Sequence, residues 1–279
     1  MNEMKRLIAC FLLLGIILCG CSEPAEPKDD SSQLPSASTP TTESTPSGDL
    51  PSETPSQPES KKVTVYLLEK IVYFDNGHID FTYDEAYNIV SWEHTSLDKV
   101  KITETLFEDR DANGMAATVR TKWADGSEGD SRKLTYFENG RIRDDIMEGE
   151  GYSGYRYSYD TNGRLTEKSE YYDNVLLYTV RFEYEGGKLK AVSYKDAAGN
   201  DAYIITVKNG LITEKKSAAA DEDYSYRLKY DENGNIKSTT FIYDGEELPS
   251  DQYSYKAVEV DANRAEYIME QQRYLTNII

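Results

Sequence analysis

The chain has 279 residues, of which 31 are basic and 50 are acidic, and its formal net charge is −19 at pH 7. Such a chain repels nucleic acid and anionic lipid headgroups, so neither is an expected partner. It contains two histidines, and its three cysteines, Cys10, Cys19 and Cys21, all lie near the amino terminus. The residues after Cys21 offer no disulfide framework and little material for zinc or nucleophilic chemistry, so we expect no metal, no cofactor and no catalytic residue.

The amino terminus has the pattern of an export signal. Lys5 and Arg6 precede an apolar run, Leu7–Leu18, of signal-peptide length. The Leu-Cys-Gly-Cys sequence that ends at Cys21 resembles the lipobox of bacterial lipoproteins, in which the cysteine becomes the first mature residue and carries acyl chains. The resemblance implies that residues 1–20 are removed and that Cys21 is lipidated. The mature protein would then be anchored to the outer face of a bacterial membrane without spanning it. The alternative is a plain secretory signal that contains two cysteines.

The segment after Cys21 is rich in proline, serine and threonine. Residues 22–60 hold eight of the nine prolines and no aromatic residue. This composition offers too little apolar surface to offset the entropy lost on ordering. We therefore expect residues 21–60 to be a disordered tether, spanning on the order of 35 Å as a flexible coil.

Turn signals recur at a regular interval from about residue 61 onward. The small residue that ends each turn falls at Asn88, Gly114, Gly140, Gly163, Gly187, Gly210 and Gly234. A second signal lies between many of these turns, as at Asp125-Gly126 and Asp173-Asn174. Two turns in about 24 residues leave two segments of strand length, so each unit is predicted to be a β-hairpin.

Aromatic and charged residues alternate within these units. Tyr155, Tyr157 and Tyr159 share one parity, which predicts a sheet with one sheltered and one solvated face. In the turns, Asn-Gly supplies the positive backbone φ of a tight hairpin, and the preceding Asp can accept hydrogen bonds from the turn's own amides. Tyrosine therefore fills the sheet, and Asp-x-Asn-Gly reverses the chain.

Four stretches resemble the YD repeats of the RHS and teneurin type, in the short form found on bacterial lipoproteins: "YSYDTNGRLTE", "LKYDENGNIKS", "FEYEGGKLKAV" and "LTYFENGRIRD". The resemblance covers roughly residues 70–248. It is weaker in the first units, where Asn88 takes the place of glycine and "FEDRDANGMAA" lacks the tyrosine. In large members, such repeats wind a β-sheet into a shell around a cargo, and other members are implicated in surface contact and carbohydrate binding. The resemblance implies a scaffold and supplies no catalytic residue.

The predicted fold is all-β over residues 61–260. About seven hairpins would form an antiparallel meander of about 14 strands, one long twisted and partly curled sheet with tyrosines on its concave side. Each strand should pair only with its neighbours in sequence, and the first and last units should not pair. A closed barrel is disfavoured because the lumen would be wide and the tyrosines too few to fill it.

The carboxy terminus changes to a helical pattern. Asp261 is a candidate N-cap, and Ala265, Ile268, Met269, Gln272 and Leu275 recur at helical spacing. We predict a helix over about residues 262–276, within a capping segment of residues 261–279. Its predicted role is to cover the last strand edge, because an unprotected edge invites pairing with another chain.

The expected function is that of a lipid-anchored surface protein in the cell envelope, a binding or structural module for glycans or a protein partner and not an enzyme. Tyrosines and tryptophans on an exposed sheet would stack on sugar rings or on a partner. The candidate contact residues are Trp92, Trp123, Tyr155, Tyr157, Tyr159, Tyr178, Tyr184 and Tyr226. The simpler interpretation is that the tyrosines are the core residues of the repeat.

Two acidic patterns suggest other chemistry. Asp109–Gly114 matches the first half of a calcium loop, but Arg120 stands where that loop needs a glutamate, which favours a hairpin turn. A polysaccharide-active envelope enzyme using a carboxylate pair is the alternative function. Its candidate carboxylates are Asp144, Asp145, Glu148 and Glu150. In so acidic a chain, a solvated face explains them more simply.

Overall fold

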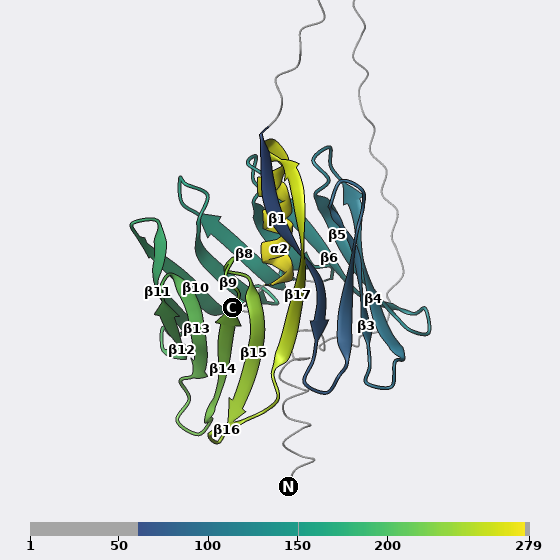
Figure 1. Ribbon diagram of the computed structural model, residues 1–279. Helices are drawn as coiled ribbons and strands as arrows, with labels where there is room; N and C mark the ends of the chain where they lie inside the picture. The colour runs from purple at the N-terminus through teal and green to yellow at the C-terminus, as the bar shows by residue number, and fades with distance from the viewer. Residues whose placement is uncertain (1–60, 150, 277–279) are drawn as a thin grey trace, which may run out of the picture. The chain divides into compact units, whose positions relative to one another are not determined.

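The structure, a computed structural model, describes residues 61–149 and 151–276. The predicted signal peptide, Cys21, the tether, Glu150 and residues 277–279 lie outside the described residues. The described chain forms an antiparallel sheet followed by a helix, α2 (Ala262–Leu275) (Figure 1). The prediction of an all-β fold with a carboxy-terminal helix is confirmed.

The strands of the first half are β1 (Lys62–Val72), β2 (His78–Tyr83), β3 (Ile89–Thr95), β4 (Lys101–Arg110), β5 (Ala116–Trp123), β6 (Glu128–Tyr136), β7 (Ile142–Met147) and β8 (Gly154–Tyr159). Those of the second half are β9 (Leu165–Tyr172), β10 (Val175–Glu185), β11 (Lys188–Asp196), β12 (Asp201–Lys208), β13 (Leu211–Ser217), β14 (Tyr224–Tyr230), β15 (Ile236–Tyr243), β16 (Glu246–Glu247) and β17 (Asp251–Asp261).

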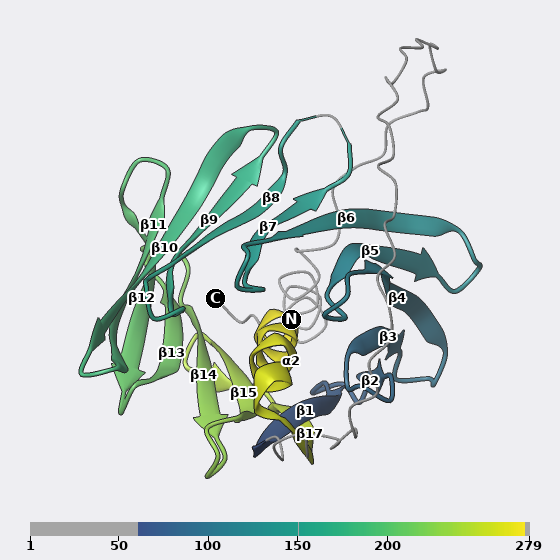
Figure 2. The same cartoon turned by 90° about the horizontal axis from the view of Figure 1, so that it is seen from above.

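The sheet closes on itself, so the prediction of an open curled meander is wrong. Successive strands pair as expected, but β1 also pairs with β17, from Lys62 opposite Asp261 to Val72 opposite Gln252. The short β16 pairs with β15, which also pairs with β17. Among the described residues, sixteen strands thus make a closed antiparallel barrel (Figure 2). Closure removes both free edges, which would otherwise be open to pairing with other chains.

The repeat turns form where the sequence places them. Asp160 accepts hydrogen bonds from the backbone amides of Asn162 and Arg164, each at 2.9 Å. Asp231, in the turn between β14 and β15, makes the equivalent bonds with the amides of Asn233 and Asn235. The first turn differs by one residue from the prediction, because Tyr87, with φ of 65°, takes the left-handed position and Asn88 follows it.

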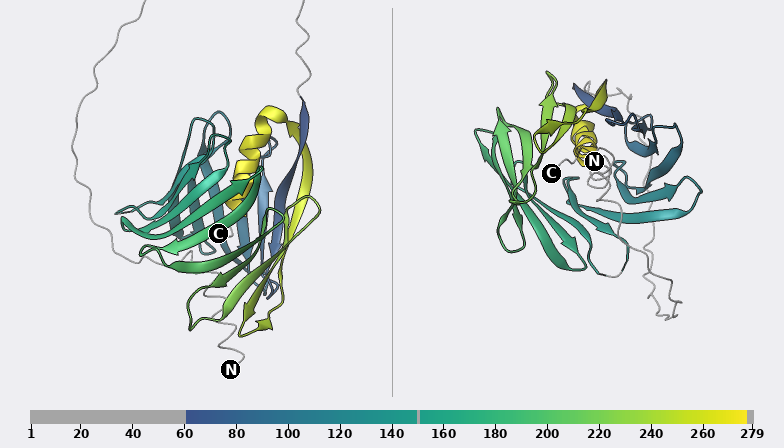
Figure 3. Two further views of the ribbon diagram at one scale, coloured as in Figure 1. Left: turned by 90° about the vertical axis from the view of Figure 1, so that its left-hand side faces the viewer. Right: turned by 90° about the horizontal axis from the view of Figure 1, so that it is seen from below.

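The helix lies inside the closed sheet, so its predicted role of covering an exposed strand edge is also wrong. Figures 2 and 3 show α2 within the ring of strands, beside β1 and β17. Ala265 and Ile268 pack there against Val65, Leu67 and Val258. The edge that α2 was expected to cover is already paired with β1, and the helix instead fills part of the lumen.

Candidate functional site

Seven residues occupy equivalent places in the wall, one directly after each repeat turn. Across its hairpin, each of them is paired with the residue that stands where the repeat motif has its tyrosine, just before the turn. Leu165 is paired in this way with Tyr159, and Ile236 with Tyr230. The ladder shifts register at both tyrosines, which are therefore sites of a β-bulge. We call these seven residues the turn ring: Ile89, Ala116, Ile142, Leu165, Leu189, Ile212 and Ile236.

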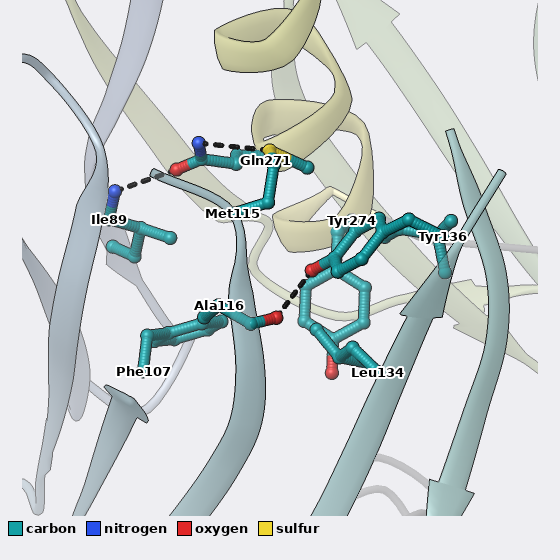
Figure 4. A pocket seen from close by; sticks show the side chains of 9 residues that line it. Ile89, Phe107, Met115, Ala116, Leu134, Tyr136, Gln271 and Tyr274 are labelled. Atoms are coloured by element: carbon teal, nitrogen blue, oxygen red, sulfur yellow. Dashed lines mark hydrogen bonds between the residues drawn. The ribbon is translucent and has the colours of Figure 1, made fainter. Parts of the chain in front are cut away.

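Helix α2 covers the first three members of the turn ring, all of which are buried. The Ile89 amide donates a 2.8 Å hydrogen bond to Gln271 Oε1, and the Ile142 amide donates a 3.1 Å bond to Glu270 Oε1. Tyr274 and Ala116 line the same small void, which Figure 4 shows from close by. The void measures about 10 Å³, so it has room for one water at most.

The other four members of the turn ring line a larger cavity, which we call the inner groove. Its volume is about 420 Å³. Its described lining consists of Arg141, Asn162, Gly163, Arg164, Leu165, Phe182, Tyr184, Leu189, Ile212, Leu228, Tyr230, Ile236, Arg273 and Thr276. The walls therefore come from the β6–β7 and β8–β9 turns, from strands β9, β10, β11, β13, β14 and β15, and from the carboxy-terminal end of α2.

Two tyrosines in the inner groove have their hydroxyl groups engaged by the wall. Tyr184 donates to the Leu165 carbonyl at 3.0 Å, and Tyr230 donates to the Ile212 carbonyl at 2.6 Å. Burial raises the pKa of Tyr184, and it raises the pKa of Tyr230 to about 12, so both rings are neutral near pH 7. Together with the aliphatic residues, they give the groove a largely apolar wall.

Three arginines form one side of the inner groove. Arg141 and Arg273 both pair with the buried carboxylate of Glu270, at 3.0 and 2.5 Å. Arg164 pairs with Asp160 at 2.6 Å, and its guanidinium lies 4.6 Å from the centre of the Tyr184 ring. Among the described residues that line the groove, none is acidic.

A second polar cluster lies deeper in the barrel wall. The ammonium of Lys168 lies 4.3 Å from the Tyr155 ring, and that of Lys215 lies 4.3 Å from the Tyr203 ring. Burial lowers the pKa of Lys168 to about 7 and that of Lys215 to about 8, although the charge of Glu170 opposes the shift at both. These groups are packed among tyrosines and do not line the inner groove.

The eight aromatic residues predicted to contact a ligand are spread over several parts of the wall. Of these, Tyr184 lines the inner groove. Trp92 packs edge-to-face on Phe81 and Phe107. The remaining six lie in other parts of the wall. Tyr155 and Tyr157 lie around the lysine cluster, and Tyr178 packs beside Tyr194. Tyr159 donates a hydrogen bond to Glu270, and Tyr226 packs on Phe241. Trp123 is half-buried at the end of β5.

The acidic residues of the alternative hypotheses have structural partners. Asp144 and Asp145 are consecutive in β7, so their side chains point to opposite faces of the sheet. Burial raises the pKa of Asp144, but hydrogen bonds from Arg156 and other donors outweigh it and leave the pKa lowered. Asp145 pairs with Arg132 at 2.7 Å. Glu148 accepts a hydrogen bond from the hydroxyl of Ser131.

The partial calcium motif forms a hairpin turn in which Asp111 Oδ1 accepts from the amides of Asn113 and Met115. In the described part of the chain, no group of three or more acidic, His or Cys side chains is placed to hold a metal ion.

Sequence reasoning missed the arginines and the carboxy-terminal glutamate of this site. A signal for the groove wall was present, because an apolar residue recurs two positions after most turn glycines, as in "NGRL", "GGKL" and "NGNI". Whether such an apolar residue lines the groove depends on whether α2 covers it, and tertiary packing decides which members of the turn ring α2 covers.

No protein-family model and no curated protein matches the chain. Among solved structures, the chain is similar to a porin-like protein from Bacteroides uniformis, at 14% identity and a TM-score of 0.40, over 71% of this chain and 98% of that one. It is also similar to part of a Photorhabdus luminescens Tc holotoxin pore, at 10% identity and a TM-score of 0.29. That match covers 65% of this chain and 13% of the other.

The class of the protein follows from its own fold, an all-β closed barrel that holds its carboxy-terminal helix inside. Within the part of the chain that the structure describes, no helix has the length and apolar character needed to cross a membrane.

Proposed function

We propose that the protein is a lipid-anchored binding module of the bacterial cell envelope, with its ligand site in the inner groove. The observation that carries the proposal is the unequal cover of the turn ring: α2 buries Ile89, Ala116 and Ile142, whereas the four later members line a cavity of about 420 Å³. That volume falls within the range of small-molecule sites. A ligand that covers these half-buried apolar residues gains hydrophobic free energy.

Anchoring is supported by the lipobox-like sequence that ends at Cys21 and by the proline-rich segment after it. It is tested by fractionating cells that express the full chain or its Cys21→Ala variant. We expect the full chain in the membrane fraction and the variant outside it. Equal membrane retention of the two proteins would argue against lipidation of Cys21.

Binding in the groove is tested with a variant that fills it. Leu189→Trp places an indole in the groove, and Ile204→Trp places the same group on the outer face of β12, where Ile204 is 55% exposed. The mature chain from residue 21, with Cys21→Ser, would be applied to a glycan array in all three forms. For any glycan retained, we expect binding by the parent and by Ile204→Trp, and at least tenfold weaker binding by Leu189→Trp. Equal binding by all three forms would place the site elsewhere.

A further inference from the structure

We infer that the ligand of the inner groove is a small amphipathic anion, with an apolar body and a single negatively charged end. This inference rests on the proposed function, because it names the class of ligand for the same groove. It is carried by the composition of the groove lining, in which aliphatic and aromatic residues stand together with three arginines and no acidic residue.

The apolar wall is a continuation of the surface that α2 covers in the first hairpins. Leu165, Leu189, Ile212 and Ile236 stand where Ile89, Ala116 and Ile142 stand under the helix. Phe182 and Leu228 extend this surface along neighbouring strands. Because the tyrosine hydroxyls of the groove are bonded to strand carbonyls, the wall favours hydrocarbon over a hydroxylated ligand.

The three arginines of the basic side carry more positive charge than their carboxylate partners neutralise. Among the described residues, three guanidinium groups, those of Arg141, Arg164 and Arg273, share two close carboxylates, Glu270 and Asp160, which leaves an excess of one positive charge. A further carboxylate, Glu266, lies 3.9 Å from Arg141, but it is 68% exposed, so water screens it.

Each guanidinium carries five N–H donors, and the ion pairs use only some of them. The Arg273 side chain is 42% exposed, and it lies on the last turn of α2 beside the groove. Its planar fork matches a carboxylate or a phosphate. The net charge of −19 repels anions at long range, but within the groove the local positive excess selects an anion over a cation.

The probe that we would use is decanoate, titrated calorimetrically into the mature chain from residue 21 carrying Cys21→Ser. Decanol tests the need for charge, decyltrimethylammonium tests its sign, and monodecyl phosphate distinguishes a phosphate end from a carboxylate end. We expect one site for decanoate, at least tenfold weaker binding of decanol, and none of the cation. Octanoate should bind about fifteenfold more weakly than decanoate, because it lacks two methylenes and each buried methylene contributes roughly a factor of four.

Variants locate the two ends of the ligand. Arg273→Gln should weaken decanoate binding at least tenfold while leaving decanol unchanged, and Leu189→Trp should abolish the binding of both. The matched controls are Arg181→Gln, at a residue whose side chain is 68% exposed on β10, and Ile204→Trp, and both should bind as the parent does. Circular dichroism of each variant verifies folding.

The outcomes separate this inference from the proposed function. Equal affinity for decanoate and decanol, or unchanged decanoate binding by Arg273→Gln, would overturn the anionic ligand. If decanoate fails to bind but a glycan binds in a manner that Leu189→Trp abolishes, the groove is a binding site and the ligand class is wrong. If Leu189→Trp changes no binding at all, both proposals fail.

Discussion

In three of the hairpins, the hydroxyl group of the repeat tyrosine makes a hydrogen bond to the hairpin before it. Tyr136, Tyr184 and Tyr230 stand at register shifts, and each hydroxyl donates to the carbonyl of a turn-ring residue on the previous hairpin. Two repeat tyrosines differ: the Tyr83 hydroxyl donates to the Leu68 carbonyl of β1 at 2.8 Å, and the Tyr159 hydroxyl donates to Glu270 of α2 at 2.9 Å. The hydroxyl bond gives tyrosine a role here beyond that of an aromatic ring, although Arg110 and Val207 take this position in two other hairpins.

Replacing Tyr184 by Phe tests this role. The Tyr184→Phe variant keeps the ring but leaves the Leu165 carbonyl without that donor, so we expect a loss of about 0.5–1.5 kcal/mol in the free energy of unfolding. Tyr172→Phe is the control, since Tyr172 is exposed on β9, and it should change the free energy by less than about 0.5 kcal/mol. Urea unfolding measures both, and equal effects would contradict the bridging role.

A buried carboxyl should make stability depend on pH. Burial raises the pKa of Asp251 to about 6, and Tyr73 and Asp75 lie close by. Because the folded state favours the protonated form, this group's contribution is complete below pH of about 3.8 and is lost as the pH rises through about 6.

We therefore expect Asp251→Asn, which keeps an acceptor for the Phe74 amide, to gain stability over the parent as the pH rises between these values. Relative to the difference between the two proteins below pH of about 3.8, the gain should reach about 3 kcal/mol at pH 7 in urea unfolding. A constant difference between Asp251→Asn and the parent across this range would disprove the linkage.

At the scale of elements, α2 is held by polar contacts as well as by apolar packing. Glu270, Gln271 and Gln272 are all buried and accept hydrogen bonds from the backbone amides of Ile142, Ile89 and Leu68. Each amide belongs to a strand position at or beside a register shift, where the ladder leaves donors unpaired. The three consecutive side chains thus match bulges on three different strands.

Neighbouring residues of α2 should differ sharply in their effect on stability. Ile268 is fully buried against β1 and β17, whereas Met269 is 44% exposed. Ile268→Ala should cost about 2–5 kcal/mol in the free energy of unfolding, and Met269→Ala less than about 1 kcal/mol. Denaturant unfolding compares the two variants. Similar small losses would mean that α2 does not pack inside the barrel.

Local features of these elements could be predicted from the sequence, and distant ones could not. The Asp160 turn and the span of α2 depend on contacts within a few residues, so spacing alone located them. The place of α2 depends on Glu270 meeting Arg141 and Ile142, residues that lie far away in the sequence. The inner groove is the part of the interior that α2 leaves uncovered, so no local sequence pattern predicts where it lies.

At the scale of the whole molecule, closure depends on two strands that flank the repeats. β1 and β17 are separated by almost the entire domain, yet they pair along their full length. Strand twist accumulating over the hairpins brings them together, and the pairing buries Val65 and Val258 under α2. Tyrosines alone would not fill so wide a lumen, and closure is possible because α2 lies inside the barrel and fills part of it.

An engineered disulfide tests the closure. Thr64 and Glu259 are opposite each other in β1 and β17, and their side chains are hydrogen-bonded at 2.5 Å. In the mature chain with Cys21→Ser, the pair Thr64→Cys and Glu259→Cys should form an intramolecular disulfide on mild oxidation. The pair Thr64→Cys and Thr118→Cys, with Thr118 on β5, should not. Non-reducing electrophoresis and intact mass distinguish the products, and an open sheet would give no disulfide in either.

The central claim is that α2 fills one half of a closed barrel and leaves the other half as a ligand site. A crystal structure of the mature chain grown with decanoate tests it most directly. We expect β1 paired with β17, α2 inside the sheet, and the ligand along Leu189 and Ile212 with its carboxylate at Arg273. An open sheet, a helix outside it, or a ligand bound anywhere but the inner groove would contradict the claim.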